Sequence, residues 1–371
     1  MRPFSPARRM TSGFTMVELL VGMAICLIGL LVMSTVMMSS NQQKKTTASG
    51  ADAQTAGAIA TYMIERDLRM AGYGLNFTGL LGCKINAYDE GVSPAREFTF
   101  SMLPVVIVPG AGGASDTIEI TYTDSDVGFN APRLTQTHNG NNANYKVDNR
   151  FGFHEGNLVV VAEPGVDADG DGQDDCTLAQ VTGVPGTPGQ SDNIIHNSGN
   201  YTNAQGQNVP ARYNKPGGLG IPYTTNARVY NLGDIPANRI YAVDAATSQL
   251  TFQNTVQTVG AIGIGENIVL LRAWYAKDTN ADGSVDLYDQ VLPLTSAQWD
   301  QVVGVRFAVV ARSHNRESEP VSPATLTLWP SITLGGTTFD GPTMALDEEQ
   351  RRYRYKVFQT LVPLRNQIWR P

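Results

Sequence analysis

An apolar run near the amino terminus constrains the fold of this chain more than any other feature. Residues 14–38 form a stretch of 25 residues in which Glu18 is the only formally charged side chain. A helix needs about 20 apolar residues to cross the hydrocarbon core of a bilayer, so the run predicts a membrane-spanning helix. A carboxylate inside such a helix costs up to about 3 kcal/mol near its centre, which indicates that Glu18 has a function or a partner.

The residues before the run are basic and end in a small-residue pair. Arg2, Arg8 and Arg9 precede Ser12-Gly13, with no acidic residue among the first thirteen. An ordinary secretory signal carries its cleavage site beyond the apolar stretch. Here the cleavage signal comes first, so a cut after Gly13 would remove residues 1–13 and leave Phe14 as the new amino terminus of an attached helix.

The leader is followed by Gly, Phe, Thr, an aliphatic residue, Val and Glu, and then by an apolar helix. This order resembles type IV prepilins and the related secretion pseudopilins. The resemblance implies that a membrane-embedded prepilin peptidase cuts after Gly13 and methylates the amine of Phe14. It also implies that Glu18 pairs with the terminal amine of a neighbouring subunit, so that helices join a filament in register. An ordinary single-pass anchor with a tolerated acid is the alternative.

Apolar periodicity continues beyond the membrane run and predicts one long helix over residues 14–75, of which 14–38 cross the membrane. The positions that recur near the helical period are Ala56, Ile59, Met63 and Met70, and Asp67 interrupts them. Gly72 and Gly74 supply the stop.

We predict that residues 76–371 form a β-rich extracytoplasmic head, so that the whole chain has an α+β fold. The chain has 37 Gly and 20 Pro, and short runs rich in β-branched residues alternate with turn residues. The predicted strands lie at 116–123, 157–163, 227–233, 267–276 and 302–313. Residues 183–222 are rich in Gly, Pro and Asn and lack apolar periodicity, which favours either an exposed surface that contacts a partner or a tolerated insertion.

Three further stretches resemble minor pilins of the PilW type in particular. They are "ERDLRMAGYG", the run from Trp299 to Ser313, and the closing "YRYKVFQTLVPLRNQ". The resemblance implies a subunit that helps to initiate or prime pilus assembly beside other minor pilins and the major pilin. It implies an inner-membrane location with a periplasmic head, contact with the inner-membrane assembly platform, and later a place in the fibre near its tip.

The three cysteines permit one bridge in the head. Cys26 lies inside the apolar run, which leaves Cys83 and Cys176 as the candidates for a disulfide in an oxidising compartment. Two unrelated buried thiols are the alternative.

Two acidic loops are candidate calcium sites. "DTNADGSVDLYD" follows the twelve-residue calcium-loop pattern, and "DADGDGQDD" matches its first half. Calcium takes six to eight oxygen ligands, and alternate residues of a tight loop direct theirs inward. The candidate ligands are Asp278, Asn280, Asp282, Ser284, Asp286 and Asp289 in the first pattern, and Asp167, Asp169, Asp171 and Asp175 in the second. A plain hairpin turn and a solvated acidic loop are the alternatives.

Nothing in the sequence favours catalysis or nucleic-acid binding. The four histidines are scattered and no HExxH, GxSxG or P-loop pattern occurs. Without the leader the net charge changes from −7 to −10, which disfavours phosphate binding. Two competing functions stay open: a pseudopilin of a type II secretion or competence system, and a calcium-dependent adhesin that uses pilin export.

Overall fold

The computed structural model describes residues 13, 15–75, 79–125, 131–186, 192–258, 260–334 and 336–368. The leader residues 1–12 and Phe14 therefore lie outside the described residues. The chain divides into two compact units, Met1–Asp52 and Ala53–Pro371. The division falls inside one helix, α1 (Met16–Met70), so the second part of this helix belongs to the head.

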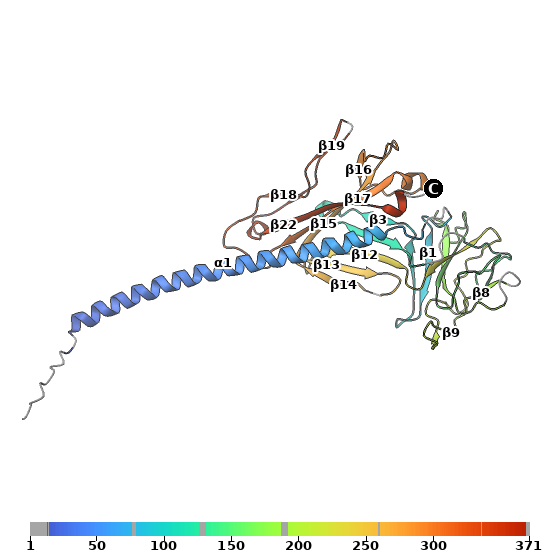
Figure 1. The fold of residues 1–371 in the computed structure, drawn as a ribbon, viewed down its shortest axis with the longest axis horizontal. Helices are drawn as coiled ribbons and strands as arrows, with labels where there is room; N and C mark the ends of the chain where they lie inside the picture. The colour runs from blue at the N-terminus through green and yellow to red at the C-terminus, as the bar shows by residue number, and fades with distance from the viewer. Residues whose placement is uncertain are drawn as a thin grey trace, which may run out of the picture. The chain divides into compact units, whose positions relative to one another are not determined.

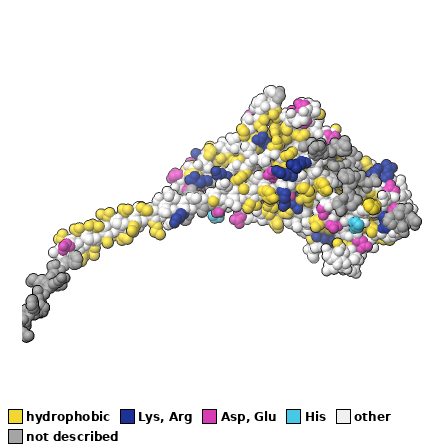
Figure 2. All heavy atoms as spheres, in the orientation of Figure 1, with side chains coloured by type: hydrophobic (Ala, Val, Ile, Leu, Met, Phe, Trp, Pro, Cys, Tyr) yellow, Lys and Arg dark blue, Asp and Glu magenta, His cyan; other side chains and the backbone are white. Residues whose placement is uncertain are grey.

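The first unit contains the membrane-spanning candidate. Residues Met16–Asn41 form an apolar helix with a mean hydropathy of 2.6, and none of the window is buried inside the structure. Yellow apolar side chains cover this part of α1 in Figure 2, with a single acidic side chain near its start. A helix that is apolar all round requires lipid or other helices as its surroundings.

The second unit begins with the part of α1 that belongs to the head core. Its buried face consists of Ala53, Gly57, Ala60, Ile64, Asp67 and Leu68, and Ala71 directly after the helix is buried as well. The apolar stripe predicted from sequence is only partly confirmed. Ala56 and Met63 are partly buried and pack against this core, whereas Ile59 and Met70 are 49% and 41% exposed. Small residues on the buried face let the helix approach the sheets closely, and their weak hydrophobicity hid that face from the periodicity analysis. The helix ends at Met70, and Gly72 and Gly74 in the following turn have φ of 76° and 75°, as a glycine stop requires.

Two antiparallel sheets pack with this part of α1 and form the largest core cluster (Figure 1). One has the strand order β14-β13-β12-β4-β3 and the other β16-β15-β17-β22. The first sheet comprises β3 (Val105–Val108), β4 (Thr117–Tyr122), β12 (Ala237–Asp244), β13 (Gln249–Asn254) and β14 (Ile262–Glu266). The second comprises β15 (Ile268–Lys277), β16 (Leu287–Asp289), β17 (Val302–Arg312) and β22 (Tyr355–Pro363).

A third sheet, β11-β6-β7-β1-β2, lies further from α1 and has a core on both faces. Its strands are β1 (Lys84–Asp89), β2 (Arg96–Ser101), β6 (Leu158–Ala162), β7 (Asp175–Gln180) and β11 (Arg228–Gly233). Along β6, Leu158, Val160 and Ala162 enter one core cluster, and Val159 and Val161 enter the other. Alternation of side chains along a strand explains why this run is apolar without a gap.

Short ladders and helices complete the described head. The ladders pair β5 (Asn144–Lys146) with β8 (Asn193–Ile195), β9 (Asn200–Thr202) with β10 (Asn208–Pro210), β18 (Thr325–Thr327) with β21 (Thr343–Ala345), and β19 (Ile332–Leu334) with β20 (Thr337–Phe339). The short helices are η1 (Ala111–Gly113), α2 (Ser296–Asp300), η2 (Gln350–Arg352) and α3 (Arg365–Ile368). The described part of 183–222 contains β8, β9 and β10 and is thus less irregular than its composition suggested, and residues 187–191 lie outside the described residues.

The contact between Gly57 and Phe358 gives a test of helix docking. A Cβ on Gly57 would lie 2.1 Å from the Phe358 ring of β22. We expect Gly57→Ala to lower the free energy of unfolding by about 1–3 kcal/mol through overpacking. Gly50→Ala is the matched control, because no described atom outside the helix's own backbone lies within 4 Å of its Cβ position. Alanine there should stabilise the helix by up to about 1 kcal/mol. Thermal unfolding of the detergent-solubilised protein measures both, and equal stability of the two variants would argue against close docking at Gly57.

Candidate functional site

Glu18 lies in the first turn of α1, where it caps the helix. Its Oε2 accepts hydrogen bonds from the backbone N–H of Thr15 at 3.0 Å and from Thr15 Oγ1 at 2.9 Å. In return, the backbone N–H of Glu18 donates to Thr15 Oγ1 at 3.3 Å. This reciprocal pattern is a capping box. The carboxylate is exposed, as is the whole helix around it, so it remains accessible to a neighbouring subunit.

The capping role of Thr15 was missed in the sequence analysis. The T-x-x-E spacing of Thr15 and Glu18 is the sequence signature of a capping box and would have revealed it. Of the other residues expected at the cleavage point, Gly13 is exposed, and among the described residues no atom lies within 4 Å of its Cβ position, whereas Phe14 is outside the described residues.

The loop 167–175 brings its acidic side chains together around a lysine. Lys84 Nζ lies 2.6 Å from a carboxylate oxygen of Asp169, 2.6 Å from one of Asp171 and 3.2 Å from one of Asp175. Lys84 opens β1 and pairs in register with Asp175 on the parallel neighbour β7. An ammonium group therefore offsets part of the negative charge of the loop, in the place where a metal ion would be expected.

The pKa values of these groups follow from the contacts. Burial alone would lower the pKa of Lys84, but its hydrogen bonds to Asp169, Asp171 and Asp175 raise it above the usual value. The hydrogen bond from Lys84 lowers the pKa of Asp171. For Asp175, burial acts to raise the pKa, and hydrogen bonds from Asn86, the Ala168 N–H and Lys84 outweigh it and lower the pKa. Lys84 therefore stays charged at neutral pH.

The loop that follows β15 repeats the backbone geometry of the first loop. Asp278 accepts from the N–H groups of Asp282 and Gly283 at 3.2 and 2.8 Å, and Asp167 accepts from those of Asp171 and Gly172 at 3.2 and 2.9 Å. The ninth residue of each loop, counted from Asp278 and from Asp167, also accepts an equivalent hydrogen bond. Asp286 accepts from the Thr279 N–H, and Asp175 accepts from the Ala168 N–H.

The two loops differ in how closely their acids converge. Among the described residues, Asp167, Asp169 and Asp175 form the one group whose ligand atoms all lie within 4.8 Å of one another. In the second loop, Asp289 lies on β16 and forms an ion pair with Lys277 at 2.7 Å, so its carboxylate is already engaged. The second loop also connects the antiparallel strands β15 and β16, which is the hairpin arrangement considered as its alternative.

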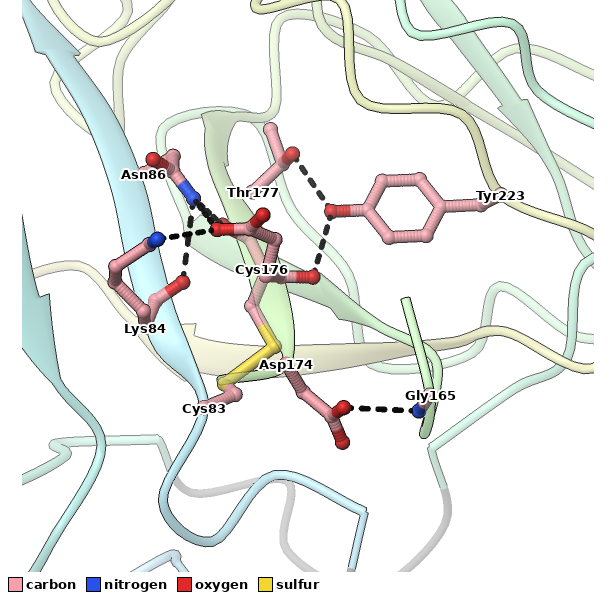
Figure 3. The surroundings of a disulfide bond; sticks show 9 residues. Cys83, Lys84, Asn86, Gly165, Asp174, Cys176, Thr177 and Tyr223 are labelled. Atoms are coloured by element: carbon pink, nitrogen blue, oxygen red, sulfur yellow. Dashed lines mark hydrogen bonds and ion pairs between the residues drawn. A yellow bond between two sulfur atoms is a disulfide. The ribbon is translucent and has the colours of Figure 1, made fainter. Parts of the chain in front are cut away.

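A disulfide joins Cys83 to Cys176, with a Cα separation of 6.0 Å and a sequence separation of 93 (Figure 3). It attaches the start of β1 to β7 next to the Lys84 cluster. Closing a loop of this length stabilises a fold by about 4–5 kcal/mol in the chain-entropy model. Cys26 is a free, exposed cysteine in α1.

Asp67 forms a buried polar cluster that the sequence analysis read only as an interruption. Its carboxylate oxygens lie 2.7 and 2.9 Å from Arg239 Nη1, and the Tyr241 hydroxyl donates to Oδ2 at 2.5 Å. Tyr122 Oη lies 3.4 Å from Oδ1. Burial and the nearby Asp67 charge raise the pKa of Tyr122 to about 12. The cluster fixes α1 to strands β4 and β12 of the head.

Comparison with known families first defines a class. Residues 8–34 match the family model described as a prokaryotic N-terminal methylation motif. The match covers Gly13, Phe14 and Glu18, so the chain is prepilin-like. Pilins of this kind are anchored by the amino-terminal helix before they enter a pilus.

A second match specifies the kind of pilin. Residues 239–366 match the model described as Type IV Pilus-assembly protein W, PilW, from β12 to α3. The two matches together support a PilW-type minor pilin of type IV pili, and these families are structural rather than enzymatic. Such a protein interacts with other pilins and with the assembly machinery. No curated protein and no solved structure matches the chain.

Proposed function

We propose that this protein is a minor pilin that helps to prime assembly of a type IV pilus through noncovalent helix packing. The observation that carries the proposal is the exposed Glu18 at the start of an apolar helix, Met16–Asn41, of which no part is buried within the subunit. Such a helix has to pack against lipid or other helices, and its carboxylate favours a positively charged partner in that apolar environment.

The proposed sequence of events follows from this arrangement. Prepilin peptidase removes residues 1–13 and methylates the Phe14 amine. The subunit then resides in the inner membrane with its head in the periplasm, where Glu18 pairs with the Phe14 amine of an adjacent subunit. Other minor pilins, the major pilin and the inner-membrane assembly platform are the partners. The head is large, which favours a position near the fibre tip over repeated use along the shaft.

The competing pseudopilin function is disfavoured by one observation. The PilW match covers residues 239–366 and includes the helix-docking residue Arg239 and the closing strand β22. A pseudopilin would share the amino-terminal motif without this region. Loss of secretion or DNA uptake with normal piliation, on deletion of the gene, would favour the pseudopilin function.

Deletion of the gene tests priming directly. A priming subunit limits how many fibres start, so electron microscopy should show fewer fibres per cell, with the remaining fibres of ordinary length. Complementation with the wild-type chain restores the number. An unchanged number of fibres would contradict the priming proposal, and uniformly short fibres would indicate a role in elongation instead.

A second proposed activity is calcium binding at the loop 278–286, through Asp278, Asn280, Asp282, Ser284 and Asp286. The loop shares its hydrogen-bond pattern with 167–175, and among the described residues no ammonium group lies within 4.0 Å of the Asp278, Asp282 or Asp286 carboxylates, whereas Lys84 fills the other loop. Calcium would have to displace Lys84 from Asp169, Asp171 and Asp175. The calcium-dependent adhesin function rests on this site.

Calorimetric titration with calcium gives a distinct result for each loop. We expect the wild type to bind at one loop, Asp282→Asn to lose that binding, and Lys84→Met to gain a second site because three carboxylates lose their ammonium partner. Asp289→Asn is the matched control, since Asp289 pairs with Lys277, and its calcium affinity should equal that of the wild type. Absence of binding to the wild type would remove the 278–286 site. Absence of a gain in Lys84→Met would remove the other.

A further inference from the structure

The part of the head between β5 and β11 lies outside both family matches and has a core of its own. The core cluster on this side of the third sheet includes Tyr145, Ile194 and Tyr223, all buried. The short ladder of β5 with β8 closes this core, because Tyr145 and Ile194 are partners in its register. A ladder of this length, around β8 in Figure 1, opens at a lower cost in free energy than the large sheets do.

His196 follows β8 directly, and its ring carries a buried nitrogen without a partner. The ring is stacked on the Tyr145 ring at 3.9 Å between centroids and 13° between planes. The backbone N–H of His196 donates to the Ala143 carbonyl at 2.9 Å, which holds the residue beside the start of β5. Its Nε2 is buried and has no hydrogen-bond partner among the described residues. A proton added to Nε2 would therefore make an N–H without an acceptor, and it would place a charge out of contact with water.

A second imidazole lies next to the first. The His138 ring is 5.6 Å from the His196 ring between centroids, and the residue is 4% exposed. His138 Nδ1 accepts from the Gly140 N–H at 3.1 Å, and its Nε2 lies 2.9 Å from the Asn142 carbonyl. These partners assign the single proton of the neutral ring to Nε2. A second proton, on Nδ1, would break the hydrogen bond from Gly140 and would repel a charge on His196.

The charged groups around the two rings do not favour a further positive charge. Among the described residues that line the two cavities beside the rings, none is Asp or Glu, and Lys146 and Lys215 are the cations. The Lys215 ammonium is paired with Glu97 at 2.7 Å. Just before β8, Asp192 is paired with Arg150 at 3.4 Å. An imidazolium at either position would therefore meet cations and no carboxylate that lines the same cavities.

The tyrosines beside the rings do not supply a negative charge either. Burial raises the pKa of Tyr145 and of Tyr223, and it raises the pKa of Tyr213 to about 12. All three side chains are therefore neutral in neutral and in mildly acidic solution. The face of the Tyr145 ring would attract an imidazolium on His196, but it offers no acceptor for the added N–H.

These surroundings make both histidines weak bases in the folded chain. Burial lowers the pKa of His138. Burial, together with the neighbouring His138, lowers the pKa of His196 to about 3, although a hydrogen bond to its own backbone acts in the opposite direction. In an unfolded chain a histidine has a pKa of about 6.5. The neutral rings therefore stabilise the closed region above about pH 6.5, and this stabilisation is lost as the pH falls from there toward about 3.

We propose that His138 and His196 form an acid-sensitive latch, which keeps the β5–β8 ladder closed at neutral pH and lets it open on mild acidification. In the open state both rings reach water and take up a proton. Opening exposes the core around Tyr145 and Ile194. The surface that this region displays at neutral pH is therefore lost in acid and returns on neutralisation. The latch is a property of the head alone and does not depend on the priming function.

Hydrogen–deuterium exchange of the detergent-solubilised full-length protein tests the latch. Exchange is measured at about pH 7.5 and about pH 5, and each amide rate is compared with that of an unstructured chain at the same pH to give a protection factor. We expect protection over residues 143–147 and 193–196 to fall about thirtyfold between the two values, because the open state binds a proton at His196 that the closed state excludes. At both values β15 and β17 should stay better protected than this ladder, since it opens without unfolding of the large sheets.

This pH range excludes the nearby carboxylates as the cause. Asp171 and Asp175 have a lowered pKa in the folded chain. The pKa of an aspartate in an unfolded chain is about 3.9, so both are almost fully ionised in either state above about pH 5. Their contribution to stability is lost only at lower pH.

Variants assign the effect to the two rings. His196→Phe keeps a ring on Tyr145 without a titrating nitrogen, so the change in protection between the two pH values should become at least about threefold smaller. His138→Asn combined with His196→Phe should remove the change. His154→Asn, at an exposed histidine of the same region, is the matched control and should show the change of the wild type. Circular dichroism at about pH 7.5 checks that each variant is folded.

The wild-type comparison stands on its own where a variant does not fold. Wild-type protection of the ladder that changes less than about threefold between the two pH values would overturn the proposal. An undiminished change in folded His196→Phe would overturn it as well, as would equal protection of the ladder and of β15 and β17 at about pH 5.

Discussion

Asp67→Asn should lower the free energy of unfolding of the head by about 3 kcal/mol, since breaking a buried ion pair leaves its partner uncompensated. Asp67 is 1% exposed, and the Arg239 side chain is 24% exposed. Asparagine has nearly the same shape and still accepts a hydrogen bond from Tyr241, so the loss reports the charge rather than a cavity. Arg239 would then lie beside the rings of Tyr122 and Phe252 without a carboxylate partner.

Chemical or thermal unfolding of the detergent-solubilised protein, followed by circular dichroism, measures this effect. Glu65→Gln is the matched control on the same helix. Glu65 pairs with Arg69, whose side chain is 53% exposed, and such surface pairs contribute about 0–1 kcal/mol. A double-mutant cycle with Arg239→Met should show coupling between positions 67 and 239. Equal stability of Asp67→Asn and Glu65→Gln would contradict the docking role of Asp67.

Glu18→Ala should be processed and inserted normally but should be absent from pili. Removal of a carboxylate from an apolar helix does not impair insertion, because the charge itself is the unfavourable group. The neighbouring Phe14 amine would, however, lose its partner in an apolar environment. If the ion pair between Glu18 and the Phe14 amine contributes more than about 1.4 kcal/mol to the free energy of subunit docking, incorporation into pili falls at least about tenfold. Immunoblots of sheared pili against whole-cell membranes measure the ratio.

Glu18→Gln separates charge pairing from helix capping. A glutamine at this position still accepts the hydrogen bonds from Thr15, so the capping box survives while the charge is lost. We expect Glu18→Gln to be excluded from pili like Glu18→Ala. Thr15→Val, which removes the capping hydroxyl and keeps the charge, should be incorporated. Normal incorporation of Glu18→Gln would show that capping, and not an intersubunit ion pair, accounts for the glutamate.

The parts of the fold that sequence predicts well are those determined by local patterns. The membrane helix comes from one continuous apolar run of 25 residues, 14–38. The strands that became β4, β6, β11, β15 and β17 each come from a short run rich in β-branched residues, which can be recognised without knowledge of distant residues. The closing strand β22 followed from its resemblance to a known family. The glycine stop after Met70 was likewise visible, because only the local backbone conformation determines it.

The parts that sequence missed depend on partners far along the chain. Asp67 meets Arg239 across 172 residues, and Lys84 meets Asp169 across 85, so neither pair leaves a local pattern. The predicted core face of the docked helix was only partly right, for a related reason. Ala53, Gly57 and Ala60 face the core because close approach favours small side chains, whereas a periodicity analysis gives most weight to large apolar ones.

Mass spectrometry of the amino-terminal peptide from sheared pili tests the central claim most directly. Cleavage after Gly13 in a chain that keeps its apolar helix is the step on which pilus incorporation depends. The account predicts a peptide that begins with N-methylated Phe14, recovered together with other pilins. A chain that begins at Met1, or one cut beyond Met38 and released from the membrane, would contradict it.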